Sequence, residues 1–274
     1  MSPLRLGTRG SALALAQARW VAERLPGDVE LVEITTAGDL DRARGDKSRW
    51  TGALERALLE GSIDAAVHSA KDVPGELADG TALAAVPARE DPRDVVVGAL
   101  REGARVGTSS LRRRAQLLAW RPDLEVVELR GNVDTRLRKL ADGEVDALVL
   151  AAAGLARLGR SDVAAAPLEG DVFVPAPGQG CLAVQARAGE RFDAVDDPDA
   201  HAALSAERAV VARLGASCHT PVGIHFNGSS MAAFAGLPDG SEWLLDEASD
   251  PDVLAERMLS AGVADLLARA EAVA

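Results

Sequence analysis

The stretch LRLGTRGSALALAQARWVAERL, residues 4–25, contains the building unit of the fold. Its first five residues alternate between apolar and polar character and predict a β-strand. Residues 12–25 have the apolar spacing of an amphipathic helix, and a Gly-Thr-Arg-Gly-Ser turn joins the two elements directly. A strand that passes at once into a helix predicts an α/β protein with mainly parallel sheets.

The unit recurs along the chain. RLGT at residues 5–8 returns as RVGT at residues 105–108, and GSIDAAV at residues 61–67 returns as GEVDALV at residues 143–149. Two similarly built α/β halves are therefore expected, and such halves usually enclose a ligand cleft between the carboxyl ends of their strands. The other predicted strands are 29–35, 63–68, 124–129 and 145–150, and the other predicted helices are 51–60, 111–120 and 133–140.

A third unit follows the second half. The breaker cluster PAPGQG, residues 175–180, cannot continue a regular helix. The expected fold class is α/β with three domains, two similar halves and a smaller α/β C-terminal domain. The elements predicted for the third unit are a helix at 202–214, strands near 222–226, 231–235 and 242–245, and a closing helix at 253–273.

The composition is that of a globular protein with an acidic balance, because 47% of the residues are hydrophobic and the formal net charge is −12. Nucleic acid is therefore not an expected partner, and no apolar run is long enough to span a membrane. We recognise no signal peptide, so we expect a cytoplasmic protein in which Cys181 and Cys218 stay reduced. No cysteine spacing suggests a metal site, and since nothing demands an oligomer we expect a monomer.

Basic side chains concentrate in residues 101–140, which hold ten basic and five acidic residues. This zone is either a site for a small anionic ligand or a solvated helix face. The turns GTRGS (residues 7–11) and GTSS (residues 107–110) favour a ligand, because each precedes a helix whose N-terminal N–H groups attract anions. Arg9 adds a bidentate carboxylate donor, whereas Ser11 has an alternative role as a helix cap.

Two further motifs follow predicted strands. HSAKDVP, residues 68–74, starts where open α/β sheets hold their sites. A carboxylate beside a lysine there either stabilises a cation and moves protons or forms a surface ion pair of little value. In RGNVDTR, residues 130–136, Arg130 ends a strand and Arg136 lies in a helix, so both are able to approach one anionic group. The candidate side chains of the first motif are His68, Ser69, Lys71 and Asp72.

Cys218 lies in a loop of turn-forming residues, GASCHTPVG, residues 215–223. It is a small apolar residue without a role, a hydrolase nucleophile paired with His219, or the attachment point of a cofactor. Adjacent side chains usually diverge, and no third orienting group is evident, which disfavours the hydrolase. A metal site made of Cys218, His219 and His225 matches no common ligand spacing.

Seven motifs occur in a fixed order along the chain: GTRGSALALAQA, AVHSAKDVP, GTSSLRR, LRGNVDTRL, AAAGLARLG, PAPGQG and GASCHTPVG. In this order they resemble the porphobilinogen deaminases, also called hydroxymethylbilane synthases. The resemblance runs from about residue 4 to at least residue 226. It implies a transferase that joins four porphobilinogen molecules head to tail, releases ammonia each time, and then hydrolyses off the linear tetrapyrrole hydroxymethylbilane.

The resemblance also implies a cofactor and a domain arrangement. A dipyrromethane, held by a thioether to Cys218, is the primer on which the tetrapyrrole grows. The fold consists of two periplasmic-binding-protein-like α/β halves that enclose a cleft and a smaller cofactor-bearing domain. The implied borders are residues 1–88 with 181–196 for the first, catalytic half, 89–180 for the second, anion-binding half, and 197–274 for the third domain.

Roles for side chains come from the same resemblance. Asp72 is implied as the catalytic carboxylate, because a carboxylate stabilises the pyrrole cations that arise when ammonia leaves. The residues implied to hold the cofactor, besides Cys218, are Ser69, Lys71, Asp72, Thr108, Ser110, Arg112, Arg113, Arg130 and Arg136. Those implied to bind the substrate are Arg9, Ser11, Arg130, Arg136, Arg157 and Gln179.

The chain departs from the family pattern in two places. The loop that commonly reads GGKGLFTKELE reads GDKSRWTGALE at residues 45–55, so Lys47 is kept and Gly52 replaces the second lysine. Cys181 stands where alanine is usual and is interpreted as a small core residue. The rival hypothesis is a non-catalytic anion-binding module, which explains the arginine-rich turns but neither the third domain nor Cys218. A cysteine hydrolase is a more distant alternative.

Overall fold

The computed structural model describes residues 2–36, 48–164, 166–217 and 220–273, and Lys47, Cys218 and His219 lie outside these ranges. The chain divides into two compact units, Met1–Glu90 with Gly180–Leu204 and Asp91–Gln179 with Ser205–Ala274. It passes between them after Glu90, after Gln179 and within one helix, α7 (Pro198–Arg213). The first two passages fall in segments without helix or strand, residues 86–93 (the first linking segment) and 168–181 (the second linking segment).

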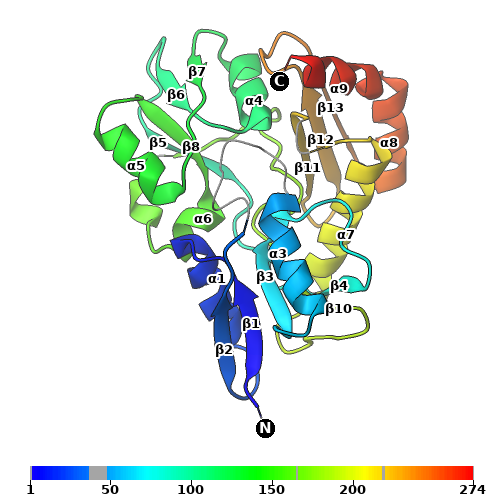
Figure 1. Cartoon of the computed structure of the whole chain (residues 1–274). Helices are drawn as coiled ribbons and strands as arrows, with labels where there is room; N and C mark the ends of the chain where they lie inside the picture. The colour runs from blue at the N-terminus through cyan, green and yellow to red at the C-terminus, as the bar shows by residue number, and fades with distance from the viewer. Residues whose placement is uncertain (1, 37–47, 165, 218–219, 274) are drawn as a thin grey trace. The chain divides into compact units, whose positions relative to one another are not determined.

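The first unit contains a five-stranded sheet in the order β2-β1-β3-β10-β4 (Figure 1). The strands β1, β2 and β3 run parallel, and β10 pairs antiparallel with both β3 and β4. The bounds are β1 Leu4–Thr8, β2 Val29–Glu33, β3 Ala65–Ser69, β4 Thr81–Ala85 and β10 Leu182–Arg187, with helices α1 Ala12–Ala22 and α3 Ser48–Leu59 and the short 3₁₀ helix η1 Ala70–Asp72.

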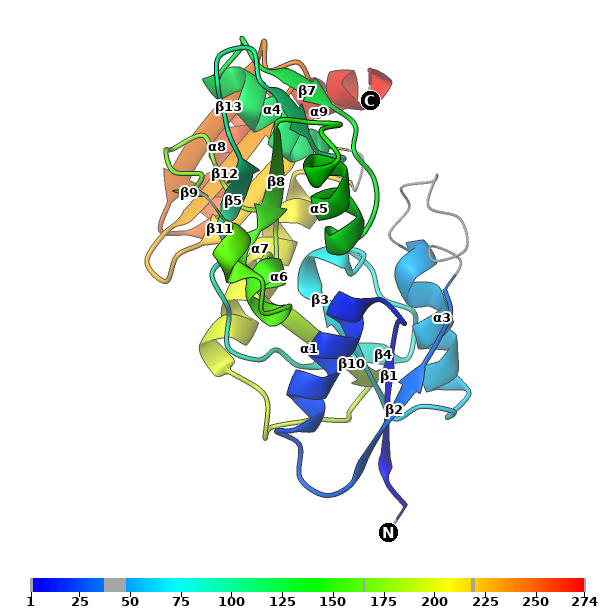
Figure 2. The ribbon, with the colours of Figure 1, turned by 90° about the vertical axis from the view of Figure 1, so that its left-hand side faces the viewer.

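The helices α1 and α3 cover opposite faces of this sheet (Figure 2). Ala65 and Val67 of β3 pack in the cluster that contains Ala18 and Val21 of α1. The residue between them, Ala66, packs instead with Leu54 and Leu58 of α3. Since successive side chains of a strand point to opposite faces, the next residue on the α3 face is His68.

The second unit repeats this topology. Its larger sheet has the order β7-β6-β8-β5-β9, with β6 parallel to β7 and β8, and β5 antiparallel to β8 and β9. The strand β5 thus takes the place that β10 has in the first sheet, which confirms the two similar halves expected from the sequence. The bounds are β5 Asp94–Gly98, β6 Arg105–Gly107, β7 Glu125–Val127, β8 Ala147–Ala151 and β9 Ala166–Pro167, with α4 Leu111–Trp120, α5 Val133–Ala141, α6 Ala152–Arg157 and η2 Ser161–Val163.

The repeated glycines, Gly7 and Gly107, have the same packing role in the two halves. A Cβ added at Gly7 would lie 2.4 Å from Ile63 Cδ1, and one added at Gly107 would lie 2.9 Å from Leu129 Cδ2. Both contacts are shorter than van der Waals contact, so a side chain at either position would force the neighbouring Ile63 or Leu129 side chain to move. The repeat in RLGT and RVGT therefore reflects close packing at corresponding points.

The C-terminal part of the second unit is a three-stranded antiparallel sheet of β11 (Val222–Phe226), β12 (Met231–Gly236) and β13 (Trp243–Ala248). The expected single closing helix is wrong, because the structure has α8 (Pro251–Ser260) and α9 (Val263–Ala272). The break falls at Gly262, whose φ of 92° is left-handed and ends the first helix. The three-domain α/β fold class predicted from the sequence is confirmed.

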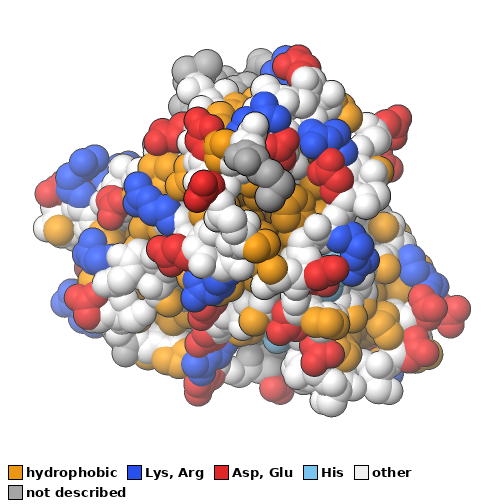
Figure 3. Space-filling view, turned by 90° about the horizontal axis from the view of Figure 1, so that it is seen from below, with side chains coloured by type: hydrophobic (Ala, Val, Ile, Leu, Met, Phe, Trp, Pro, Cys, Tyr) orange, Lys and Arg blue, Asp and Glu red, His pale blue; other side chains and the backbone are white. Residues whose placement is uncertain are grey.

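Other differences are local. The first helix ends at Ala22 rather than residue 25. The strands β4, β5, β9 and β10 and the helix α6 were not predicted. Among the described residues, none of the helices has the length and apolarity that crossing a membrane requires. On the face shown in Figure 3, basic and acidic side chains are interspersed, so that face carries no continuous basic surface of the kind that binds nucleic acid.

Candidate active site

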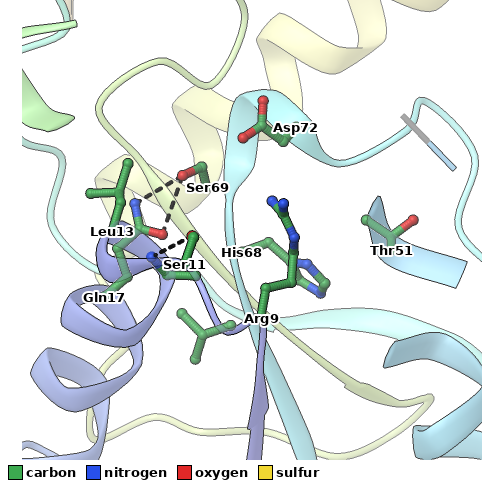
Figure 4. Close-up of a pocket in the computed structure, with 10 residues that line it drawn as sticks. Arg9, Ser11, Leu13, Gln17, Thr51, His68, Ser69 and Asp72 are labelled. Atoms are coloured by element: carbon green, nitrogen blue, oxygen red, sulfur yellow. Dashed lines mark hydrogen bonds between the residues drawn. The ribbon is translucent and has the colours of Figure 1, made fainter. Parts of the chain in front are cut away.

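A pocket lies at the carboxyl ends of β1 and β3 in the first unit (Figure 4), with a cavity volume of about 60 Å³. The turn after β1 brings Arg9 and Ser11 to it, and the end of β3 with η1 brings Ser69 and Asp72. These four residues come from two motifs about sixty positions apart, and they meet because parallel neighbouring strands end at the same edge. The other lining residues are Leu13, Ala14, Gln17, Thr51, Val67 and His68.

Ser11 is the N-cap of α1, and its Oγ accepts a hydrogen bond from Ala14 N at 3.3 Å. The alternative capping role is thus present, yet the hydroxyl keeps its own hydrogen for donation into the pocket. Arg9 extends its guanidinium toward the side of the pocket that carries Asp72 in Figure 4. A cation and a carboxylate therefore border the same small cavity.

Gln17 holds the end of β3 to the first helix. Its Nε2 donates to Ser69 Oγ at 2.8 Å, and Ser69 Oγ lies 3.2 Å from Gln17 Oε1. Gln17 is buried, and the sequence interpretation did not single it out. The available signal was a glutamine among the apolar residues of the helix that Ser11 caps.

His68 lines the pocket but carries no charge at neutral pH. Burial lowers the pKa of His68 to about 4, outweighing the Glu55 and Asp72 carboxylates, which favour its protonated form. Glu55 is also buried on the α3 face, where its Oε1 accepts from Gln185 Nε2 at 3.0 Å and from Ala78 N at 3.2 Å. The sequence interpretation did not identify Glu55 as a buried carboxylate on α3.

The second unit presents a matching turn. Ser110 caps α4 by accepting from Arg113 N at 3.4 Å, as Ser11 caps α1. Thr108 is buried, and its Oγ1 accepts from Ser110 N at 3.2 Å. This turn places Arg112 and Arg113 in the first turn of the helix.

Both of these arginines are buried against one carboxylate. Asp94 Oδ2 accepts from Arg112 Nη2 at 2.8 Å, and Asp94 Oδ1 accepts from Arg113 Nη2 at 2.7 Å. Burial lowers the pKa of Arg112, and the attraction of Asp94 opposes this effect. Gln179 is buried in the same cluster and donates to Asp94 Oδ1 at 2.9 Å, so it is not displayed on an open surface.

The remaining predicted site residues are more accessible. Arg136 donates to Ser109 Oγ at 3.0 Å, which brings it next to the turn before α4. Arg130 is exposed and donates to Glu128 Oε1 at 2.6 Å, while Arg157 is the half-buried last residue of α6. Lys71 is half-buried in η1 beside Asp72.

Of three further residues singled out from the sequence, two lie outside the described residues and one lies in the core. Cys218, the expected anchor, and Lys47, the retained loop lysine, lie in the undescribed segments. Cys181 is buried together with Ala70, Val73 and Leu204, in agreement with its interpretation as a small core residue. Among the described residues, no group of three or more histidine, cysteine or acidic side chains is arranged to hold a metal ion.

Similarity to known proteins extends over almost the whole chain. The family model described as "Porphobilinogen deaminase, dipyromethane cofactor binding domain" matches residues 4–193. The chain belongs to the porphobilinogen deaminase family. The porphobilinogen deaminase of Roseiflexus castenholzii is 47% identical over 298 aligned residues, covering 97% of this chain and 98% of that protein. That of Brevibacillus brevis is 40% identical, covering 98% of this chain and 97% of the relative.

Among solved structures, the substrate binding protein of an amino acid ABC transporter aligns with 71% of this chain and 90% of its own, with a TM-score of 0.36 and 15% identity. The porphobilinogen deaminase match confirms the family, the transferase activity and the dipyrromethane cofactor predicted from the sequence. It also removes the two rival hypotheses, the binding module and the cysteine hydrolase.

Proposed function

We propose that this chain builds hydroxymethylbilane from four porphobilinogen molecules with Asp72 as the carboxylate at the reacting ring. The reaction and its dipyrromethane cofactor follow from membership of the family. The observation that supports the assignment of Asp72 is the pocket at the ends of β1 and β3, where Asp72, Arg9, Ser11 and Ser69 meet. Open α/β sheets hold their sites at this edge, where side chains from separate strands meet.

The donor set of the chain fits a cofactor that carries acetate and propionate groups. Arg112 and Arg113 share the single carboxylate of Asp94, so this buried cluster has one more positive than negative charge. The Nε–H groups of both arginines are buried and lack a partner among the described residues. Such N–H groups cost free energy unless an acceptor arrives, and a carboxylate of the cofactor would supply both the acceptor and the missing negative charge.

The proposed roles follow from charge. When bound through Cys218, the cofactor supplies the terminal pyrrole carbon to which the first substrate ring is joined. Asp72 stabilises the positive charge that the substrate acquires as its amino group leaves as ammonia, and it accepts or returns protons at the pyrrole nitrogen. Because Asp72 lies in a partly enclosed pocket, its charge is screened less than it would be in open solvent.

Arginine side chains bind the carboxylates of the growing chain, since their planar forks match carboxylate geometry. The proposed ligands of substrate carboxylates are Arg9, Arg130, Arg136 and Arg157, with Ser11 as a hydroxyl donor. Those proposed for the cofactor are Lys71, Arg112, Arg113, Arg130 and Arg136, with the hydroxyls of Ser69, Thr108 and Ser110.

We also propose the domain division 1–88 with 181–196, 89–180 and 197–274, and a monomer that works in the cytoplasm. Three separate sheets support the division. A solution mass near 28.4 kDa by light scattering is the expected result, and twice that mass would contradict it.

The assignment of Asp72 is tested by Asp72→Asn, compared with Glu76→Gln as a matched control. Glu76 is exposed and only four positions away. We expect Asp72→Asn to keep the fold and the covalent cofactor but to lose roughly 100-fold or more in turnover. Glu76→Gln should match the parent. Near-parent turnover of Asp72→Asn would overturn the assignment.

A further inference from the structure

Asp94 begins β5 directly after the first linking segment and is buried. Its two carboxylate oxygens are divided between two arginines, with Oδ2 accepting from Arg112 and Oδ1 from Arg113. Consecutive residues on a helix point about 100° apart, so neighbouring arginines do not converge by themselves. One carboxylate between them is what brings the two guanidinium groups together.

The other Nη groups of these arginines are held as well. Arg112 Nη1 donates to Gln116 Oε1 at 2.8 Å and to Val174 O at 3.1 Å. Arg113 Nη1 donates to Val149 O at 3.0 Å. In each guanidinium both Nη atoms are therefore fixed, and the Nε–H is the donor whose hydrogen bond is not made within the described residues. The cluster fixes the orientation in which that donor is offered.

Gln179 connects the cluster to the second linking segment. Its Nε2 donates to Asp94 Oδ1 at 2.9 Å and to Pro92 O at 2.6 Å, and its Oε1 accepts from Arg112 Nη2 at 3.4 Å. Pro92 belongs to the first linking segment, and Gln179 is the last residue before the chain re-enters the first unit. One buried carboxylate thus joins the arginine pair to both segments that link the two units.

We propose that Asp94 is a positioning residue that orients Arg112 and Arg113 for carboxylate binding. Gln179 then acts through Asp94 and Arg112, which it contacts, and does not itself touch the substrate. This inference rests on the proposed role of the two arginines as carboxylate ligands. It revises the expectation that Gln179 is a substrate ligand. A purely structural ion cluster is the alternative, and it would affect folding stability without changing how carboxylates are bound.

The test compares purified full-length variants by three measurements: the fraction that carries dipyrromethane on Cys218 by intact mass, KM against kcat for porphobilinogen, and the ¹⁵N NMR signals of the arginine Nε–H groups. We expect Asp94→Asn to raise KM or lower the loaded fraction roughly tenfold or more, since hydrogen bonds to charged groups are among the stronger ones. We also expect its two arginine signals to show faster side-chain motion. Asp94→Glu, which keeps the charge, should recover part of the loss.

Asp91→Asn is the matched control. Asp91 lies three positions away, and its ion pair with Arg93 is on the surface, so this variant should match the parent in all three measurements. If Asp94→Asn does not fold, Gln179→Met replaces it, because this variant keeps every charge and removes only the amide. We expect Gln179→Met to raise KM severalfold with little change in kcat.

The proposal is overturned if folded Asp94→Asn, or Gln179→Met in its place, matches the parent in KM, loaded fraction and arginine signals. Arg113→Gln tests the carboxylate-binding role of the arginine pair directly, and so shows whether a failure concerns only the positioning role of Asp94 or the proposed function as well. If Arg113→Gln weakens loading or raises KM while the Asp94 and Gln179 variants do not, only the positioning role fails. If Arg113→Gln also behaves like the parent, the carboxylate-binding role of the pair fails with it.

Discussion

Gln17 and Ser69 are joined side chain to side chain, with Gln17 Nε2 2.8 Å from Ser69 Oγ. One residue lies on the first helix and the other ends the strand that leads to Asp72. Their hydrogen bond therefore fixes one wall of the pocket to the segment that carries the proposed catalytic carboxylate. Positions 17 and 69 belong to separate motifs in the sequence.

We predict that Gln17→Leu lowers the free energy of unfolding by about 1 kcal/mol, because Ser69 loses its partner. Ser69→Ala should cost a similar amount, and the double variant should cost clearly less than the sum of the two. Urea unfolding of the three variants measures this coupling. Additive losses would show that the two side chains do not depend on each other.

The buried, neutral His68 should make the folding stability depend on pH. Its pKa is about 4 in the folded chain and near 6.5 when unfolded, so between these values the unfolded state binds the extra proton. The free energy of unfolding should therefore fall as the pH drops from 6.5 to 4, by on the order of 2–3 kcal/mol. His68→Gln, measured by urea unfolding at several pH values, should lack this part of the decline. An unchanged pH profile in that variant would contradict the buried, neutral histidine.

The packing of the repeated glycine is tested by Gly107→Ala. The new methyl group would lie within 3.1 Å of Leu129 Cβ and of Leu148 Cδ2, so we expect a loss of about 1–3 kcal/mol. Gly52→Ala is the control, since a Cβ there meets nothing within 4 Å and lies in the helix α3. That variant should gain up to about 1 kcal/mol from helix propensity. Equal thermal stability of the two variants would contradict the close packing of β6.

Replacing Arg130 should change substrate binding but not folding stability. Its ion pair with Glu128 is largely exposed, so Arg130→Ala should change the free energy of unfolding by less than about 0.5 kcal/mol. If Arg130 binds a carboxylate of the growing chain, KM for porphobilinogen should rise severalfold or elongation should stall. Arg121→Ala is the control, because Arg121 is also paired on the surface, with Asp123, and has no proposed role. Identical kinetics of both variants would remove Arg130 from the binding site.

The sequence predicted the parallel core of both halves because strand and helix periodicity is local. Residues 4–8 and 105–108 alternate clearly, and each is followed by a serine cap. The strands β5 and β10 were missed although the run DVVVG of β5 is itself a local strand signal. Their antiparallel pairing joins segments about fifty to more than a hundred positions apart, and no local pattern reports that pairing. The break at Gly262 was missed because the apolar spacing continues on both sides of it.

Local sequence patterns were likewise only partly sufficient for the candidate site. Arg9, Ser69 and Asp72 were identified because motifs carry them to strand ends. Asp94 was not, since in the run EDPRD it looks like one more surface charge, and only the fold shows that it is buried. Which residues are buried, and which side chains they contact, depends on distant segments of the chain. Sequence patterns therefore reveal least about residues such as Asp94 that act by positioning other side chains.

The most direct test of the proposed function is the mass of the purified chain under denaturing conditions, followed by mapping of the peptide that contains Cys218. We predict an added mass equal to two linked pyrroles with their acetate and propionate groups, located on Cys218. Cys181 serves as the internal control, because it is buried and should remain unmodified. If incubation with porphobilinogen leaves Cys218 unmodified, or places the addition on Cys181, the proposed anchor is wrong.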